Sequence, residues 1–342
     1  MNGLVKRADY CQFLLASQVN YTLTYFADHA WGFSHDAATR YLRGDRLRPS
    51  EVWEQVKGEL VLSPKGYLIF DDSVLDKNYA REIEGVYRQY SGNEHRIIRG
   101  IGLISCVYVN PDSEEFWVID YRIYDPDTDG KDKHQQVSDM LDSCLWRCNK
   151  GELDVRTILM DRWYAITKLM VKIHLAGLYF CCPIKPNRAV SEVKEDEKYQ
   201  YQKAEDLSWT EEELDLGKQV HLREFPQGLD LKLFRIAVST DGTEFIVTND
   251  VSLLDAQAVQ HVQGLRWKVE QFHREVKQVT GIEACQCRNA RSQRNHIGCA
   301  LLVWLCLKRY AKQMFTTIYQ LKQGLLDDYL RQQLQKPSLV FS

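Results

Sequence analysis

The amino-acid sequence predicts an α/β protein in which helices flank a mixed sheet, with a helical domain at the N-terminus and a β-rich insertion late in the chain. Three observations lead to this fold class. The stretches 66–70 and 157–160 are short apolar runs, as buried strands are. Residues 266–277 have the period of an amphipathic helix. Residues 220–248 hold further strand-like runs, which places a second group of strands before that helix.

The composition is that of an ordinary globular protein. Hydrophobic residues make up 44% of the 342 positions and charged residues 27%. The longest apolar stretch near the C-terminus, 297–307, is too short to cross a membrane, so we expect a buried helix there and no membrane partner. The 10 cysteines are scattered along the chain, which favours reduced thiols and a cytoplasmic protein over a secreted one.

The N-terminal residues predict two helices, 14–27 and 34–42. Ser34 is a suitable N-cap for the second helix, and Arg40 and Arg43 lie near its end. Such a pair is consistent with a helix-turn-helix that binds DNA, and equally with a plain helical bundle.

The middle of the chain alternates between strands and helices. An antiparallel group comes first, with strands at 66–70, 101–109 and 116–124. A helix at 135–147, a strand at 157–160, a helix at 164–174 and a strand at 178–184 follow.

An acidic segment precedes the second group of strands. Residues 192–215 contain ten acidic and three basic side chains, counted along the sequence. Strands are predicted at 220–225, 231–239 and 243–248, with a tight turn at 240–242. Residues 261–322 carry the opposite balance, eleven basic side chains against three acidic ones, which is compatible with a DNA-binding groove.

The helix at 266–277 has two distinct faces. Its apolar face is formed by Leu265, Val269, Phe272, Val276 and Val279. On the other side, Glu270 shares a narrow stripe with Arg266, His273 and Lys277. A carboxylate is therefore held among cations, where an ordinary exposed helix would form only weak surface ion pairs.

Two aspartates extend this pattern, because each follows an apolar run. Asp72 comes after 66–70 and Asp161 after 157–160, so we expect both at strand ends that line one crevice. Each alone is also typical of a simple turn at the end of a strand. Together with Glu270 they form a set of oxygen ligands suited to hard divalent cations.

The order Asp72, Asp161, Glu270 resembles the ribonuclease H-like core of the DDE transposases of bacterial insertion sequences. The closer resemblance is to the insertion-sequence-four type, whose last motif spaces an Arg, a Glu and a Lys as Arg266, Glu270 and Lys277 are spaced here. Gln263 departs from the motif, which has Tyr at that position. Ser73 after Asp72 and Arg162 after Asp161 also fit the family, and the similarity extends over about 66 to 300. Because the family has a hydroxyl residue after its first Asp, the resemblance favours Asp72 over the adjacent Asp71, and strand alternation then points Asp71 the other way.

The resemblance implies cut-and-paste transposition by metal-dependent cleavage and joining of DNA strands. It implies that Asp72, Asp161 and Glu270 are both the catalytic residues and the ligands of two Mg²⁺ ions, with Mn²⁺ as a substitute. The partners would be double-stranded DNA, in the form of terminal repeats and target, and a second copy of the chain that pairs two ends. A DNA partner would also place the protein at the nucleoid. Some relatives extrude a base onto a tryptophan, for which Trp163 and Trp209 are the candidates here. Two alternatives remain open: a catalytically silent DNA-binding regulator and a metal-dependent nuclease of the same fold.

Basic residues near these motifs are the expected DNA contacts. They are Arg266, Lys277, His273, Arg274, Lys185, Arg188, Arg288, Arg291, Arg294, Arg40 and Arg43. Arg288, Arg291 and Arg294 recur every three residues, which predicts one row on a helix.

The expected domain organisation has five segments. They are an N-terminal helical DNA-end-binding domain (1–62), the first part of the ribonuclease H-like core (63–190), an acidic and β-strand insertion (191–249), the second part of the core with the Glu helix (250–318) and a C-terminal tail (319–342).

Overall fold

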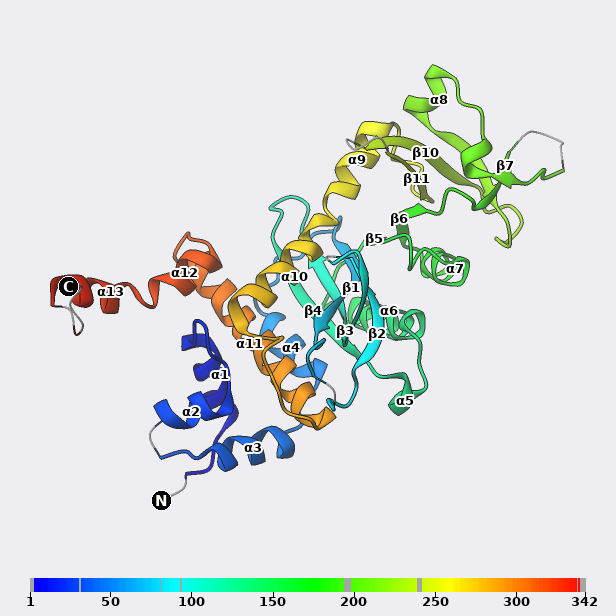
Figure 1. Cartoon of the computed structure of the whole chain (residues 1–342). Coiled ribbons are helices and arrows are strands. Elements are labelled where there is room, and N and C mark those ends of the chain that lie inside the picture. The colour runs from blue at the N-terminus through cyan, green and yellow to red at the C-terminus, as the bar shows by residue number, and fades with distance from the viewer. Residues whose placement is uncertain are drawn as a thin grey trace.

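The computed structural model describes residues 3–30, 32–80, 82–92, 94–193, 198–238, 242–336 and 338. Its sheet and helices form a central layered body, with the N-terminal helices on one side and a strand-rich lobe extending away on the other (Figure 1). The helical segment at the C-terminus projects from the body (Figure 1). Among the described residues, no helix is long and apolar enough to span a membrane.

The central sheet has the strand order β2–β3–β1–β5–β6, with β4 also paired to β3. β3 is antiparallel to β1, β2 and β4, whereas β5 is parallel to both β1 and β6. The bounds are β1 (Tyr67–Asp76), β2 (Tyr87–Ser91), β3 (Arg96–Val109), β4 (Phe116–Tyr124), β5 (Thr157–Met160) and β6 (Tyr179–Ile184). This is the mixed sheet of a ribonuclease H-like fold, and the predicted fold class is confirmed.

The first strand is longer than the sequence predicts. β1 does not end before Asp71 and Asp72 but continues to Asp76, because its pairing with β3 runs unbroken from Tyr67 to that residue. The expectation that the strand ends at these aspartates is therefore wrong for β1. It is correct for β5, which ends at Met160.

Helices cover the sheet on two sides (Figure 1). α10 (Trp267–Thr280) and α11 (Ala290–Gln313) lie on one side, and α6 (Lys133–Asn149) and α7 (Thr167–Leu175) on the other. The short α5 (Pro126–Asp129) lies at the edge of the sheet, after β4. The predicted apolar face of α10 is buried throughout, from Leu265 to Val279. The predicted start of α7 at 164 is wrong, since the Asp161 carboxylate accepts hydrogen bonds from the backbone of Trp163 and Tyr164 and holds them in a turn.

The N-terminal residues form α1 (Arg7–Ala16), α2 (Leu23–His29), α3 (His35–Gly44) and α4 (Pro49–Val56). The prediction of one helix over 14–27 is wrong. Asn20 accepts from the backbone of Thr22, and Thr22 in turn caps α2, so the chain leaves one helix and begins another. The second predicted helix is confirmed as α3, with Ser34 as its N-cap.

These helices pack directly on α11. The Tyr10 hydroxyl lies 2.8 Å from His296 Nδ1, and Asn295 donates hydrogen bonds to the carbonyls of Leu42 and Asp45. The N-terminal helices and the long C-terminal helix therefore share one apolar core.

The predicted insertion continues the same sheet. β6 pairs with β11, and the order continues as β11–β10–β9–β7–β8. The elements are β7 (Ala189–Glu192), β8 (Gln202–Lys203), α8 (Glu211–Leu216), β9 (Lys218–Leu222), β10 (Leu231–Val238) and β11 (Gly242–Thr248). After the insertion, α9 (Ala256–Gly264) leads to α10. The strand predicted at 220–225 ends earlier, at Leu222, where a turn begins. In the predicted 240–242 turn, residues 240 and 241 lie outside the described residues.

The C-terminal segment contains two short helices where the sequence predicted only a tail. They are α12 (Ile318–Gly324) and α13 (Asp327–Gln335). Lys322 of α12 donates hydrogen bonds to the carbonyls of Leu14 and Leu15 at the end of α1, which fastens α12 to the N-terminal helices.

Candidate active site

A pocket of about 880 Å³ lies where β1, β5 and α10 meet. It is lined by all three predicted catalytic residues, Asp72, Asp161 and Glu270, and by Asp71. Four of the predicted DNA contacts also line it, namely Arg266, His273, Arg274 and Lys277. The fold thus gathers residues nearly 200 positions apart in the chain into one cavity.

Asp71 and Asp161 follow neighbouring positions of two parallel strands. Phe70 is in register with Met160, so the residues that follow them, Asp71 and Asp161, come side by side at the carboxyl end of β5. Burial, together with the charge of Asp161, raises the pKa of Asp71 to about 8. Burial also raises the pKa of Asp161. Two carboxyls are therefore held close together in a site with too little positive charge to keep both ionised.

Asp72 points to the other side of β1 and is held by two partners. Lys133 Nζ lies 2.6 Å from one of its carboxylate oxygens, and the Tyr164 hydroxyl donates to the other at 2.6 Å. Asp72 is nevertheless close enough to Asp161 to contribute to the raised pKa of that carboxyl. Asp161 thus lies within the electrostatic reach of both aspartates.

The polar stripe of α10 is already paired within the protein. Arg266 forms an ion pair with Glu270 at 2.7 Å and a longer one with Asp71 at 3.7 Å. Lys277 Nζ donates to the Val74 carbonyl at 2.8 Å and lies 3.2 Å from Glu283. The Arg266 guanidinium therefore links the carboxylate of the helix with the carboxyl of the first strand.

The two remaining predicted DNA contacts on α10 have different environments. His273 is buried and its Nε2 lies 3.1 Å from Ser105 Oγ on β3. Burial, assisted by the charge of Lys277, lowers the pKa of His273 to about 3, so its ring is neutral at ordinary pH. Arg274 lies over the exposed ring of Trp267, 4.8 Å from its centroid.

The chemistry of the lining suits a hard divalent cation, because carboxylate oxygens are its preferred ligands. The carboxylates of the pocket do not form a closed coordination shell in this structure. Within the described ranges, no three Asp, Glu, His or Cys side chains converge as metal ligands do. Arg266 on Glu270 and Lys133 on Asp72 occupy carboxylate oxygens that a cation would take.

Other predicted DNA contacts lie away from this pocket. Lys185 and Arg188 line a second pocket of about 320 Å³, next to the first. Arg40 and Arg43 are exposed on α3. The predicted row of Arg288, Arg291 and Arg294 is wrong in part, since α11 begins only at Ala290 and Asn289 is its cap.

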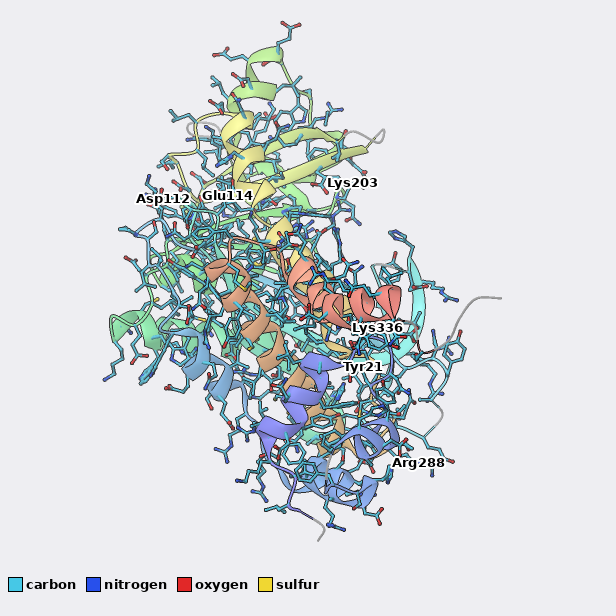
Figure 2. All side chains as sticks on the ribbon, turned by 90° about the vertical axis from the view of Figure 1, so that its left-hand side faces the viewer. Tyr21, Asp112, Glu114, Lys203, Arg288 and Lys336 are labelled. Atoms are coloured by element: carbon cyan, nitrogen blue, oxygen red, sulfur yellow. The ribbon has the colours of Figure 1, made fainter. Side chains whose placement is uncertain are left out.

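These three arginines also have different partners. Arg288 pairs with Glu82 at 2.6 Å, and Arg294 pairs with Asp125 at 2.5 Å, whereas Arg291 is exposed. Figure 2 shows Arg288 at the end of the molecule opposite to Lys203 of the insertion.

The two candidate tryptophans differ in exposure. Trp163 is 55% exposed, stacks on His134 with ring centroids 5.6 Å apart and lies between the two pockets. Trp209 is packed against the core, and its indole nitrogen is buried without a partner among the described residues. Of these two tryptophans, only Trp163 lines the candidate site.

The sequence favours Asp72 over Asp71, and it misses two partners of Asp72, namely Lys133 in the pocket wall and Tyr164. The pairing register of β1 with β5 identifies Asp71, and no pattern in the sequence carries that register. Lys133 is the first residue of α6 after its cap, Asp132, and only the tertiary contact with Asp72 reveals its importance.

Comparison with known proteins agrees with this geometry. A family model described as a transposase DDE domain matches residues 74–306, more than half of the chain. The match includes Asp161 and Glu270 and begins just after Asp72. No curated protein matches the chain.

Proposed function

This chain belongs to the DDE transposase family, and we propose that it catalyses cut-and-paste movement of an insertion sequence of the insertion-sequence-four type. The observation that carries the proposal is the single pocket that collects Asp72, Asp161 and Glu270 beside Arg266 and Lys277. The spacing of the three α10 residues supports the subtype.

The proposed cofactor is Mg²⁺, bound as two ions, with Mn²⁺ as a substitute. The sequence favours Asp72 as the first ligand because Ser73 follows it, whereas the register of β1 and β5 favours Asp71 as the neighbour of Asp161. We propose that Asp161 and Glu270 bind the metal together with the β1 aspartate that faces them. Ions held by these carboxylates would supply the Lewis acidity needed to activate a water or a DNA 3′-hydroxyl and to stabilise the leaving oxygen.

The protein's own residues would then act by exchanging partners. Arg266 leaves Glu270 for a phosphate oxygen next to the scissile bond, which frees the carboxylate and clamps the DNA in one movement. Lys133 makes the corresponding exchange at Asp72. Lys277 and Arg274 supply further positive charge at the pocket wall. His273, buried and neutral, positions α10 against β3.

The proposed partners are double-stranded DNA and a second copy of the chain. Joining two element ends to one target requires two active sites, which a homodimer supplies. Exposed apolar side chains on α13, including Leu330 and Leu334, offer a surface that a second copy can cover.

The test uses labelled DNA that carries the ends found beside the gene, with Mg²⁺ or with a chelator. We expect 3′-end cleavage and joining by the wild type with Mg²⁺, and neither by Asp161→Asn. Cleavage without joining would identify a nuclease of the same fold instead. Tight binding with no cleavage by the wild type would identify a silent regulator.

The first metal ligand is identified by comparing Asp71→Asn with Asp72→Asn. The variant that lacks the metal-binding aspartate should lose cleavage, and it should also lose the binding of Mn²⁺ measured by electron paramagnetic resonance. The other variant retains Mn²⁺ binding. If both variants retain Mn²⁺ binding, the proposal that an aspartate of β1 binds the metal is wrong.

A further inference from the structure

A second, strongly cationic pocket adjoins the catalytic one. It has a volume of about 320 Å³, and Trp163 forms part of the wall of both pockets. Its basic residues come from separate parts of the fold and are Arg162, Lys185, Arg188 and Arg223. Glu224 is its one acidic lining residue. The pocket therefore has an excess of positive charge beside the catalytic centre.

Most of this charge has no acidic partner among the described residues. Arg162 lies 3.7 Å from Glu244, a long ion pair between two partly exposed side chains. Lys185, Arg188 and Arg223 form no ion pair with the residues that the structure describes. Lys185 Nζ instead lies 5.9 Å from the ring centroid of Trp163. Three cations that line one pocket without an acidic partner are suited to an external anion.

Arg188 is prepared for a ligand by its local contacts. One of its terminal nitrogens donates a hydrogen bond to Thr167 Oγ1, which fixes the direction of the guanidinium. Its Nε is buried and has no hydrogen-bond partner among the described residues. A buried donor without a partner is unfavourable, and an oxyanion in the pocket would remove that penalty.

The N-terminus of α7 opens at the same place. Ile166 is its N-cap and lines the pocket, and its side chain cannot accept a hydrogen bond from the first turn. No acidic residue lies in that first turn. The Leu169 N–H already donates to the Ile166 carbonyl, so the attraction for an anion comes from the earlier N–H groups of the turn and from the helix dipole.

The insertion contributes the outer wall through Arg223 and Glu224. Glu224 has φ 71°, a left-handed conformation that is unfavourable for a residue with a side chain. The Arg223 N–H donates to the Ala189 carbonyl, which ties this turn to the chain next to Arg188. The strained turn holds Arg223 opposite the basic residues of the core.

We propose that this second pocket binds a backbone phosphate of the DNA strand that passes Trp163 on its way out of the catalytic pocket. The ligand class is a phosphodiester, and the inference rests on the proposed function as a DNA enzyme. The shared wall at Trp163 places the phosphate close to the scissile bond, so the pocket fixes the path of the strand. The insertion thereby takes part in DNA binding through Arg223, despite the many acidic residues on its surface.

The test measures DNA affinity by fluorescence anisotropy in chelator, so that cleavage plays no part. The variant is Lys185→Gln combined with Arg223→Gln, two exposed residues whose loss leaves the core intact. Arg235→Gln on β10 is the matched control, because it removes an exposed cation of the insertion outside the pocket. We expect about tenfold weaker binding by the double variant, and a slope of log K against log salt reduced by about 1. The control should change neither quantity comparably.

A second measurement locates the phosphate. Duplexes with one neutral methylphosphonate at successive positions should reveal a position at which the wild type loses affinity and the double variant loses nothing further. Wild-type affinity and slope in the double variant, or a loss no larger than that of Arg235→Gln, would overturn the proposal. Binding of inorganic phosphate that depends on Arg223, without any effect on DNA affinity, would also overturn it and indicate a site for free phosphate.

The outcomes separate this inference from the proposed function. Loss of DNA affinity in the double variant of a protein that never cleaves DNA would leave the phosphate site standing and reject the transposase activity. Cleavage by the wild type, together with control-like DNA binding by the double variant, would support the transposase activity and reject the phosphate site.

Discussion

Adjacent aspartates on β1 should have opposite effects on stability when each is replaced by asparagine in metal-free buffer. Burial and the charge of Asp161 raise the pKa of Asp71 to about 8, from an ordinary value of 3.8. Asp72 is instead compensated by Lys133 and Tyr164. Asp71→Asn should therefore raise the melting temperature in chelator, and Asp72→Asn should lower it.

The magnitude for Asp71 follows from proton linkage. The folded protein keeps this carboxyl protonated up to about pH 8, whereas the unfolded chain releases the proton above pH 3.8. At pH 7.5 this destabilises the folded state by roughly 5 kcal/mol as an upper limit. Arg266, 3.7 Å away, and local relaxation reduce the gain, so we expect Asp71→Asn to stabilise by about 2 kcal/mol. The Asn oxygen can still accept from the Asp72 N–H.

The stability difference between Asp71→Asn and the wild type should depend on pH. Because the pKa of Asp71 is raised in the folded state, its contribution to the stability of the fold is most favourable below pH 3.8. This contribution is lost progressively as the pH rises to 8. The difference in melting temperature between Asp71→Asn and wild type should therefore grow from pH 4 to pH 8. Differential scanning calorimetry in chelator across this range measures it. Equal destabilisation by both variants, or a difference that does not change with pH, would refute the electrostatic reasoning.

For Asp72→Asn the expected change is a loss of about 1–2 kcal/mol, because Lys133 would keep its charge with no carboxylate beside it. Addition of Mg²⁺ should raise the melting temperature of the wild type, since the cation supplies the missing positive charge. Asp161→Asn should respond less to Mg²⁺.

Three further predictions concern stability. Gly281→Ala should destabilise the fold by about 1–3 kcal/mol in urea titration, because this residue ends α10 with φ 66° and a new Cβ would lie 2.5 Å from the Tyr21 ring. Burial lowers the pKa of His296 to about 4, so as the pH falls below 6.5 the unfolded chain takes up a proton on this residue before the folded protein does. Through His296, the free energy of unfolding of the wild type should therefore decrease by about 2 kcal/mol between pH 7 and pH 5. Glu275→Leu should cost about 1–3 kcal/mol in the same titration, because the buried Trp304 N–H loses its acceptor at 2.9 Å.

Each of these has a matched control. Gly58→Ala adds a Cβ where nothing lies within 4 Å and should be nearly neutral, so an equal loss at both glycines would contradict the first prediction. Titration of the His296 ring near pH 6.5, followed by nuclear magnetic resonance, would contradict the second. Glu275→Gln keeps an acceptor for the indole, and the third prediction fails if it destabilises as much as Glu275→Leu.

Local patterns in the sequence were sufficient for much of the fold. The apolar stripe from Leu265 to Val279 predicted the buried face of α10 correctly, because burial of a helix follows its own periodicity. The strand at 116–124 was predicted to the residue, since alternation and turn residues are also local signals. Where polar side chains could start a new element, as at Thr22, the prediction of one continuous helix failed.

Some residues of the candidate site could also be recognised in the sequence, whereas others could not. Asp161, Glu270 and Arg266 were recognisable from spacing and order along the chain, since motif residues occupy fixed positions on single elements. The partners of these residues were not recognisable. Lys133 lies 61 positions from the carboxylate that it neutralises, and nothing local distinguishes it from an ordinary first-turn lysine.

The sequence by itself determined the type of most elements of the central sheet and of the helix that carries Glu270, the order of the three acidic positions along the chain, and the presence of β-strands before the last of them. Only the tertiary structure decided that Asp71 is the neighbour of Asp161, that Arg266 pairs with Glu270, and that Arg223 of the insertion lies beside Arg188 of the core. The physical reason is that strand register and long-range packing depend on contacts between distant segments. A periodic pattern along one segment records which face is buried, but not which residue of another segment lies against it.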